Sequence, residues 1–119
     1  MSRTRNTVAL GAALALLALP ATAGAATPTV TGTVGPGFTI TLKRGSTTVR
    51  TLKAGATYRF VLRDRSSMHN FHLSGPGVNR RTSVGGTGTI SFRLKIRKGT
   101  YRYVCDPHAS MMRGSFRGV

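Results

Sequence analysis

Apolar and polar residues alternate with a period of two along much of the chain after residue 27. Such alternation, rich in β-branched and aromatic residues, predicts strands that bury one face. Turn-forming clusters such as VGPGF, KRGS, SGPG and VGGTG separate these segments, and no later stretch has a helical period. Short strands at this spacing predict an all-β fold, either an antiparallel sandwich or a barrel. The predicted inward positions are Phe38, Ile40 and Leu42, then Tyr58, Phe60 and Leu62, then Ile90, Phe92, Leu94 and Ile96.

The first 26 residues follow a different pattern. Arg3 and Arg5 precede an apolar run from Val8 to Pro20, and the small residues ATAGAA follow it. This order is typical of a secretory signal peptide, with cleavage after Ala25 or Ala26. A membrane anchor is disfavoured because the run is shorter than the ~20 apolar residues that a span needs. We therefore expect a signal peptide over residues 1–26 and a single small domain over residues 27–119.

The charge of the chain is strongly one-sided. Lys and Arg number 18 against two acidic residues, Asp64 and Asp106, which gives a net charge of +16. Two of the basic residues lie in the predicted leader, so the remaining domain carries +14. Such a field favours anionic partners or surfaces, although a solvated basic face is an equally good interpretation. No Lys/Arg run or basic patch interleaved with aromatics is present, so nucleic-acid binding is not expected.

The chain has a single cysteine, Cys105. An exported chain with one cysteine cannot form an internal disulfide, which leaves a free reactive thiol, an intermolecular bridge or a metal ligand. The neighbouring residues bear on this choice, because Cys105 lies in the segment CDPHASMM, which also contains His108, Met111 and Met112. The other two histidines lie in the segment MHNFHL. Both segments follow strand patterns at turns, so they could converge at one end of a sandwich.

A thiolate, two imidazoles and a thioether form a soft and asymmetric ligand set. This set is the one known for blue-copper sites, in which a methionine is a long and weak axial ligand. Zinc would more often have further Cys or His ligands and no thioether. Because His69 and His72 are three residues apart, an extended strand would point them to opposite faces, so one metal should bind only one of them. We expect His72 to be a surface histidine or a neighbour of the ligands.

The segments MHNFHL and GTYRYVCDPHASMMRGSFRGV together resemble the cupredoxins, the small blue-copper proteins that include plastocyanin, amicyanin and pseudoazurin. The resemblance covers the domain in length, strand pattern and motif order: an early His, then Cys-x-x-His and a Met near the C-terminus. It implies a Greek-key β-sandwich with one type 1 copper ion at one end and a function in one-electron transfer.

The resemblance also implies roles for individual residues. His69, which is followed by Asn as in the family, matches the early ligand, and Cys105 and His108 match the thiolate and the second imidazole. The axial ligand is either Met111, which gives a short amicyanin-like loop, or Met112. The ending Met-x-Gly followed by a strand favours Met112. In the family His108 would reach a hydrophobic surface and pass the electron.

Three positions beside the predicted ligands, Asn70, Asp106 and Val104, are expected either to support the site or to depart from the pattern of the family. Asn70 should tie the early-ligand segment to the residue after the cysteine, which here is Asp106 where relatives often have Ser or Thr. A carboxylate so near the copper should lower the reduction potential. Val104 stands where plastocyanins have an exposed tyrosine, so electron transfer through that tyrosine is not available.

The sequence therefore predicts a secreted or periplasmic carrier of single electrons rather than an enzyme. Its redox partners should be acidic, because two acidic residues cannot form a negative docking patch. We expect a monomer that could also contact an anionic cell surface. Two other functions stay open: a non-redox copper binder, such as a chaperone or scavenger, and a basic β-domain that adheres to anionic surfaces.

Overall fold

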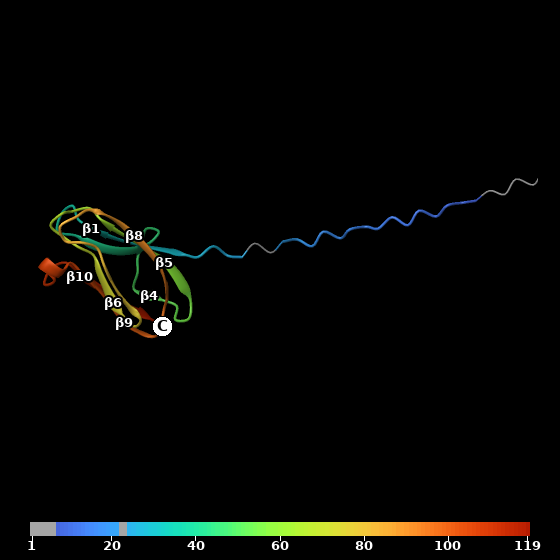
Figure 1. Cartoon of the computed structure of the whole chain (residues 1–119). Helices are drawn as coiled ribbons and strands as arrows, with labels where there is room; N and C mark the ends of the chain where they lie inside the picture. Colours follow the sequence, from blue (N-terminus) through green and yellow to red (C-terminus); the bar gives the residue numbers. More distant parts are fainter. Residues whose placement is uncertain (1–6, 22–23) are drawn as a thin grey trace, which may run out of the picture.

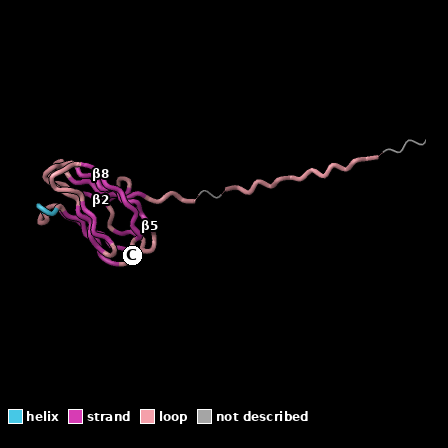
Figure 2. The backbone as a smooth tube through the Cα atoms, in the orientation of Figure 1, coloured by secondary structure: helices cyan, strands magenta, loops and turns pink. Residues whose placement is uncertain are grey.

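The computed structural model describes residues 7–21 and 24–119. Within these residues it contains ten β-strands and one short 3₁₀ helix, and the strands form two facing sheets (Figures 1 and 2). The elements in chain order are β1 (Thr29–Val34), β2 (Ile40–Arg44), β3 (Thr47–Thr48), β4 (Thr51–Leu52), β5 (Thr57–Asp64), β6 (His72–Gly75), β7 (Val78–Arg81), β8 (Gly88–Lys95), β9 (Gly99–Val104), η1 (Asp106–His108) and β10 (Arg113–Gly118).

The first sheet has the order β3-β2-β1-β5-β8 and the second has the order β4-β10-β9-β6-β7. The predicted all-β sandwich is confirmed, and its two sheets are mixed rather than antiparallel throughout. The strand β1 pairs in parallel with β5, and β4 pairs in parallel with β10. The reason is that β2 runs antiparallel to β1 and returns the chain to the end where β1 begins, after which the chain crosses to the second sheet at β4. The strand β5 therefore starts there and runs beside β1 in the same direction.

The core lies between the two sheets and is apolar. Aromatic rings fill much of it, with Tyr101 stacked on Phe116 at 4.7 Å and Phe71 stacked on Tyr103 at 5.6 Å between ring centroids. Gly114 permits this packing, because a Cβ atom at that position would overlap the Tyr103 ring. The fully or nearly fully buried core includes Val30, Val34, Leu42, Phe60, Leu62, Phe71, Leu73, Ile96, Tyr101, Met112 and Phe116. Alternation in the sequence thus predicted the inner face correctly for Leu42, Phe60 and Leu62.

One end of the sandwich gathers the segments that contain the predicted ligands. The strands β5 and β9 end there, and β6 and β10 begin there, as the antiparallel pairs β6–β9 and β9–β10 require. The loop between β5 and β6 contains His69, and the loop between β9 and β10 contains Cys105, η1 and both adjacent methionines. The convergence expected for these two segments is therefore confirmed.

The residues before β1 have no regular secondary structure in the described stretches 7–21 and 24–28. They extend away from the domain, from the end opposite η1 (Figure 1). Among the described residues, Thr27 is the first that is partly buried, and it lies one position beyond the predicted signal peptide. Arg3 and Arg5 lie outside the described residues, and the leader and its cleavage stay predictions. Nowhere in residues 7–21 and 24–119 does a helix combine the length and apolar character needed to cross a membrane.

Candidate metal centre

Three potential ligand atoms meet at the end of the sandwich. The Cys105 Sγ atom lies 3.6 Å from His69 Nδ1 and 3.5 Å from His108 Nδ1, and the two Nδ1 atoms are 3.1 Å apart. Cys105 and His69 are buried, and His108 is half-buried. Each of the two histidines directs its Nδ1 atom into the cluster. A single ion between the three atoms would therefore contact one donor from each residue.

The loop between β9 and β10 holds two of these donors in a compact turn. Cys105 is the N-terminal flanking residue of η1, and the backbone N–H of His108 donates to the Cys105 carbonyl at 3.0 Å. The Met112 N–H donates to the His108 carbonyl at 2.8 Å, and the Cys105 N–H donates to the Met112 carbonyl at 2.9 Å. Pro107 fits the first turn of η1, where its missing N–H costs no hydrogen bond. These bonds fix Cys105, His108 and Met112 relative to one another.

The loop that contains His69 is held by a buried carboxylate. Asp64 Oδ1 accepts a hydrogen bond from the Ser66 N–H at 3.1 Å, and Asp64 Oδ2 accepts one from the Thr82 hydroxyl at 2.7 Å. The same hydroxyl accepts from the Phe71 N–H at 2.8 Å. Asp64 is only 4% exposed, so these bonds satisfy groups that water cannot reach. Sequence reasoning treated Asp64 only as a charge, because nothing in the pattern marks Thr82 as its partner.

The two adjacent methionines have opposite environments. Met112 is 1% exposed and belongs to the core cluster, whereas Met111 is 66% exposed. Met112 is also the residue whose carbonyl is hydrogen-bonded to Cys105. The axial assignment stays a prediction, but the burial of Met112 in the closed loop favours it over Met111, which lies in solvent.

A pair of hydrogen bonds joins the two ligand loops. The Asn70 side-chain Nδ2 donates to Asp106 Oδ2 at 2.7 Å, and the Asp106 backbone N–H donates to Asn70 Oδ1 at 2.7 Å. The tie expected between Asn70 and the residue after the cysteine is therefore present, with a carboxylate as its acceptor. It directly connects the neighbours of His69 and Cys105.

Phe38 is the residue at this site that sequence reasoning misplaced. It was expected on the buried face of a strand, but it precedes β2, is 58% exposed and lies edge-on to both His69 and His108 at 5.1 Å between ring centroids. The Gly35 N–H donates to the Thr39 carbonyl, and the Thr39 N–H donates to the Gly37 carbonyl. Phe38 lies inside this tight loop, and the alternating strand β2 begins only after it, at Ile40. The Gly-Pro-Gly that precedes Phe38 is the signal that could have shown it.

Comparisons with known proteins agree with this geometry. The sequence model of the family described as "Copper binding proteins, plastocyanin/azurin family" matches residues 33–117, which is more than half of the chain. The chain belongs to this copper-binding family. Comparison with curated proteins gives no match. Among solved structures, rusticyanin from Thiobacillus ferrooxidans is similar, with 22% sequence identity, a TM-score of 0.57, and coverage of 81% of this chain and 79% of that one.

A second similar structure is reduced auracyanin from the photosynthetic bacterium Roseiflexus castenholzii. It has 15% sequence identity and a TM-score of 0.55, and the match covers 80% of this chain and 99% of auracyanin. At such identities the likeness shows a shared fold. It confirms the cupredoxin fold that the sequence predicted.

The donor set of this cupredoxin fits copper. Cys105, His69 and His108 supply one soft thiol and two imidazole nitrogens whose atoms all lie within 4.8 Å of one another, and Met112 adds a buried thioether in the same loop. Such a mixture is suited to copper in both oxidation states. Every buried side-chain N and O atom in the described part of the chain has a hydrogen-bond partner. The partners of His69 Nδ1 are the other two donors of the cluster, His108 Nδ1 and Cys105 Sγ.

His72 does not join the ligand cluster. It lies at the start of β6, where its Nδ1 is 2.8 Å from Asp106 Oδ1 and its Nε2 is 2.6 Å from Asn79 Oδ1. Burial lowers the pKa of His72, but the two hydrogen bonds and the Asp106 charge outweigh it and leave the pKa raised. For Asp106, partial burial raises the pKa, and the hydrogen bonds from Asn70 and His72 outweigh it and leave the pKa lowered. Both directions favour an ion pair.

The different orientations of His69 and His72 have another cause than the geometry of one extended strand. His69 and His72 do not share one extended strand, since His69 lies in the loop before β6. Their separation arises because the loop turns His69 into the sandwich while His72 occupies the outer face. The role expected for His72, as a neighbour of the ligands and not a ligand, agrees with its contact to Asp106.

Proposed function

We propose that this protein is an exported carrier of single electrons that holds one type 1 copper ion through His69, Cys105, His108 and Met112. The observation that carries the proposal is the meeting of the Cys105 thiol with the Nδ1 atoms of His69 and His108, at 3.6 and 3.5 Å respectively. Bound copper would supply a one-electron change between Cu(I) and Cu(II).

The protein contributes a rigid and mostly dry set of donors. Cys105, His69 and Met112 are each no more than 1% exposed, and the two ligand loops are tied by Asn70 and Asp106. Donors that cannot move keep one geometry in both oxidation states, so little rearrangement would accompany electron transfer. That property distinguishes a carrier from a chaperone, which must release its copper.

The surface around His108 supports transfer through this imidazole. His108 is half-buried, and Phe38, Met68 and Met111 are 58%, 60% and 66% exposed near the two ligand loops. An apolar surface at the imidazole would let a partner approach the site without displacing tightly held water. We therefore propose a carrier rather than an enzyme, with His108 as the point where electrons enter and leave.

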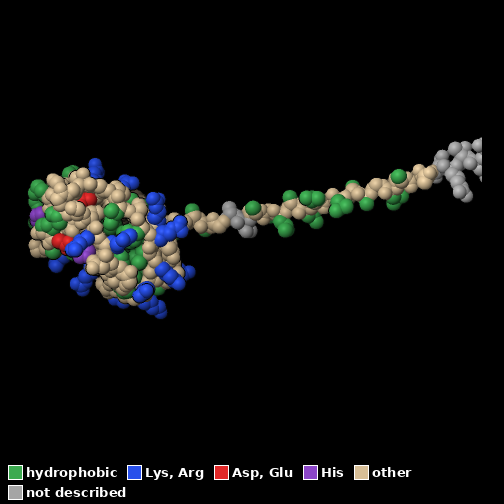
Figure 3. Space-filling model, viewed as in Figure 1, with side chains coloured by type: hydrophobic (Ala, Val, Ile, Leu, Met, Phe, Trp, Pro, Cys, Tyr) green, Lys and Arg blue, Asp and Glu red, His purple; other side chains and the backbone are tan. Residues whose placement is uncertain are grey.

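The charge of the domain supports acidic partners. Lys and Arg side chains are scattered over the face in view, mainly toward its lower edge and the side where the extended N-terminal stretch joins it, whereas few acidic atoms are visible (Figure 3). Asp64 is buried, and Asp106 is bonded to Asn70 and His72. We propose that the protein acts as a monomer in the periplasm or outside the cell, where the same charge could also bring it to anionic surfaces.

An absorption spectrum tests the proposed function. Purified protein loaded with Cu(II) should show an intense thiolate-to-copper band that bleaches on reduction and returns on oxidation. Cys105→Ser should lose this band and stay folded, as judged by far-UV circular dichroism. Wild-type protein that binds copper only as a colourless Cu(I) species would instead support a chaperone, and protein that binds no copper would support an adhesive β-domain.

A further inference from the structure

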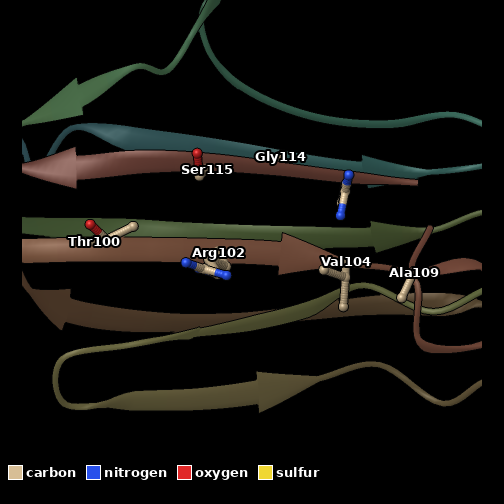
Figure 4. Close-up of a pocket in the computed structure, with 7 residues that line it drawn as sticks. Thr100, Arg102, Val104, Ala109, Gly114 and Ser115 are labelled. Carbon is tan, nitrogen blue, oxygen red and sulfur yellow. The ribbon is translucent and has the colours of Figure 1, made fainter. Parts of the chain in front are cut away.

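A groove lies on the outer face of the second sheet, beside the metal centre and outside the ligand cluster. Its volume is ≈ 540 Å³, and it is lined by β9, β10 and the loop that joins them. In Figure 4 Thr100, Arg102 and Val104 follow one strand, Ser115 and Gly114 lie on its neighbour, and Ala109 stands beyond Val104. The remaining lining residue is Arg113. The groove therefore has two arginines, two hydroxyl groups and an apolar end.

The register of the strands places these side chains on one face. Arg113 is paired with Val104 and Ser115 with Arg102, so Arg102 and Arg113 are diagonal neighbours across β9 and β10. Such diagonal positions are about 7–8 Å apart. Both arginines are exposed, and both extend the positive charge of a face that also carries Arg81 and Arg117 on the neighbouring positions of β7 and β10.

Neither Arg102 nor Arg113 forms an ion pair, and among the arginines of this face it is Arg81 whose charge lowers the pKa of Asp106. The one ion pair found among residues 7–21 and 24–119 joins His72 to Asp106, and Asp64 is buried between the sheets. Guanidinium groups bind carboxylates through two parallel hydrogen bonds, so two unpaired guanidinium groups in a groove present a site for two carboxylates. Thr100 and Ser115 add hydroxyl groups that can donate to the same oxygens or to a backbone carbonyl.

We propose that this groove docks an extended acidic segment of the redox partner, with carboxylates at alternate positions facing Arg102 and Arg113. In an extended chain, alternate residues on one side are about 6.6 Å apart, which matches the diagonal spacing of the two arginines. This inference rests on the proposed function, since it names the chemistry of the partner that exchanges electrons with the copper.

The groove is placed to bring such a partner to the metal centre. Val104 is covalently joined to Cys105, and Ala109 is joined to His108, so the apolar end of the groove is formed by neighbours of two predicted ligands. A segment seated on Arg102 and Arg113 would hold the rest of the partner against the His108 surface. Charge in the groove would thus fix the orientation of the complex, beyond the general attraction of a basic domain.

The test compares two double variants that remove the same charge from opposite faces. The groove variant is Arg102→Gln with Arg113→Gln. The control is Arg59→Gln with Arg93→Gln, which removes an exposed pair from the outer face of the first sheet. The probe is the acetylated peptide Asp-Ser-Asp-Ser-Asp, titrated at low salt into the reduced copper protein while backbone amide shifts are followed by NMR.

We expect shifts centred on Arg102, Val104, Ala109 and Ser115, and a loss of affinity of about tenfold in the groove variant but about twofold or less in the control. Equal losses in both variants, shifts centred on the first sheet or absence of binding would overturn the proposal. Displacement of the peptide by an equal concentration of inorganic phosphate would also overturn it, because the groove would then be a site for small anions.

The blue absorption of all three proteins separates this inference from the proposed function. If every protein is blue and redox-active while the groove variant binds the peptide normally, the docking site is wrong and the carrier function stands. If wild-type protein forms no blue site, the proposed carrier function is wrong. The docking proposal depends on that function and is then also wrong, regardless of the affinity for the peptide.

Discussion

Asn70 and Asp106 hold the two ligand loops together through a reciprocal pair of hydrogen bonds, each 2.7 Å long. One bond runs from the Asn70 side chain to the carboxylate, and the other runs from the Asp106 backbone back to the amide oxygen. Since Asn70 follows His69 and Asp106 follows Cys105, this pair fixes the distance between the two segments that are far apart in the sequence.

Removal of this pair should weaken both the fold and the site. Asn70→Ala leaves the Asp106 N–H without a partner and should lower the free energy of unfolding by about 2 kcal/mol, measured by urea denaturation. Asp106→Asn is the matched control at a pH above the His72 titration, where the ion pair with His72 no longer contributes, because its side-chain oxygen can still accept from Asn70 and its backbone N–H is unchanged. Similar losses in the two variants would contradict the role of the hydrogen bonds.

The buried hydroxyl of Thr82 should contribute more to stability than its size suggests. Thr82→Val keeps the shape but leaves both Asp64 Oδ2 and the Phe71 N–H without this partner, so we expect a loss of about 3 kcal/mol in unfolding free energy. Thr82→Ser retains the hydroxyl and should lose about 1 kcal/mol or less, for one buried methyl group. Equal losses for Val and Ser would show that the methyl group, not the hydroxyl, stabilises the loop.

The axial ligand can be identified by voltammetry of two neighbouring variants. Met112→Gln replaces a soft thioether by an oxygen donor, which favours Cu(II) and should lower the potential by at least about 60 mV, equivalent to about 1.4 kcal/mol for one electron. Met111→Gln should change the potential much less, since Met111 is exposed. A larger shift at Met111 would establish the short amicyanin-like loop instead.

Copper titrations should separate the two early histidines. His69→Ala removes a donor from the cluster and should abolish tight one-to-one binding of Cu(II), whereas His72→Ala should retain it. The reason is that His72 contacts Asp106 and Asn79 rather than Cys105. Tight binding that survives in His69→Ala and is lost in His72→Ala would mean that the early ligand is misassigned.

The pairing of His72 with Asp106 predicts a pH dependence. The pKa of His72 is raised, so its contribution to stability is present in full below the unfolded-state pKa near 6.5 and is lost as the pH rises through the higher folded-state value. The His72 ring signals of the Cu(I) protein should therefore titrate above pH 6.5. Asp106→Asn should move this midpoint down, and an unchanged midpoint would exclude Asp106 as its cause.

The sequence by itself determined the strands β2, β5 and β8, the all-β class, the resemblance to the family and the chemical types of the donors. Alternation identified β5 and β8 because each strand presents one face to the core. The order of apolar and polar residues within a strand is enough to predict that face. The Cys-x-x-His spacing placed Cys105 and His108 in one turn, because three residues bring them within reach in a single turn of η1. The motif order placed His69 before them.

Only the tertiary structure decided the features that depend on pairing between distant segments. The parallel pairs β1–β5 and β4–β10 follow from the path of the chain between the sheets, which no local pattern specifies. The exposure of Phe38, the burial of Asp64 against Thr82 and the groove between β9 and β10 likewise depend on which strands become neighbours. The alternation of residues within a strand determines which face each side chain occupies. The residues that it contacts belong to other strands, so these contacts are determined only when the two sheets pack together.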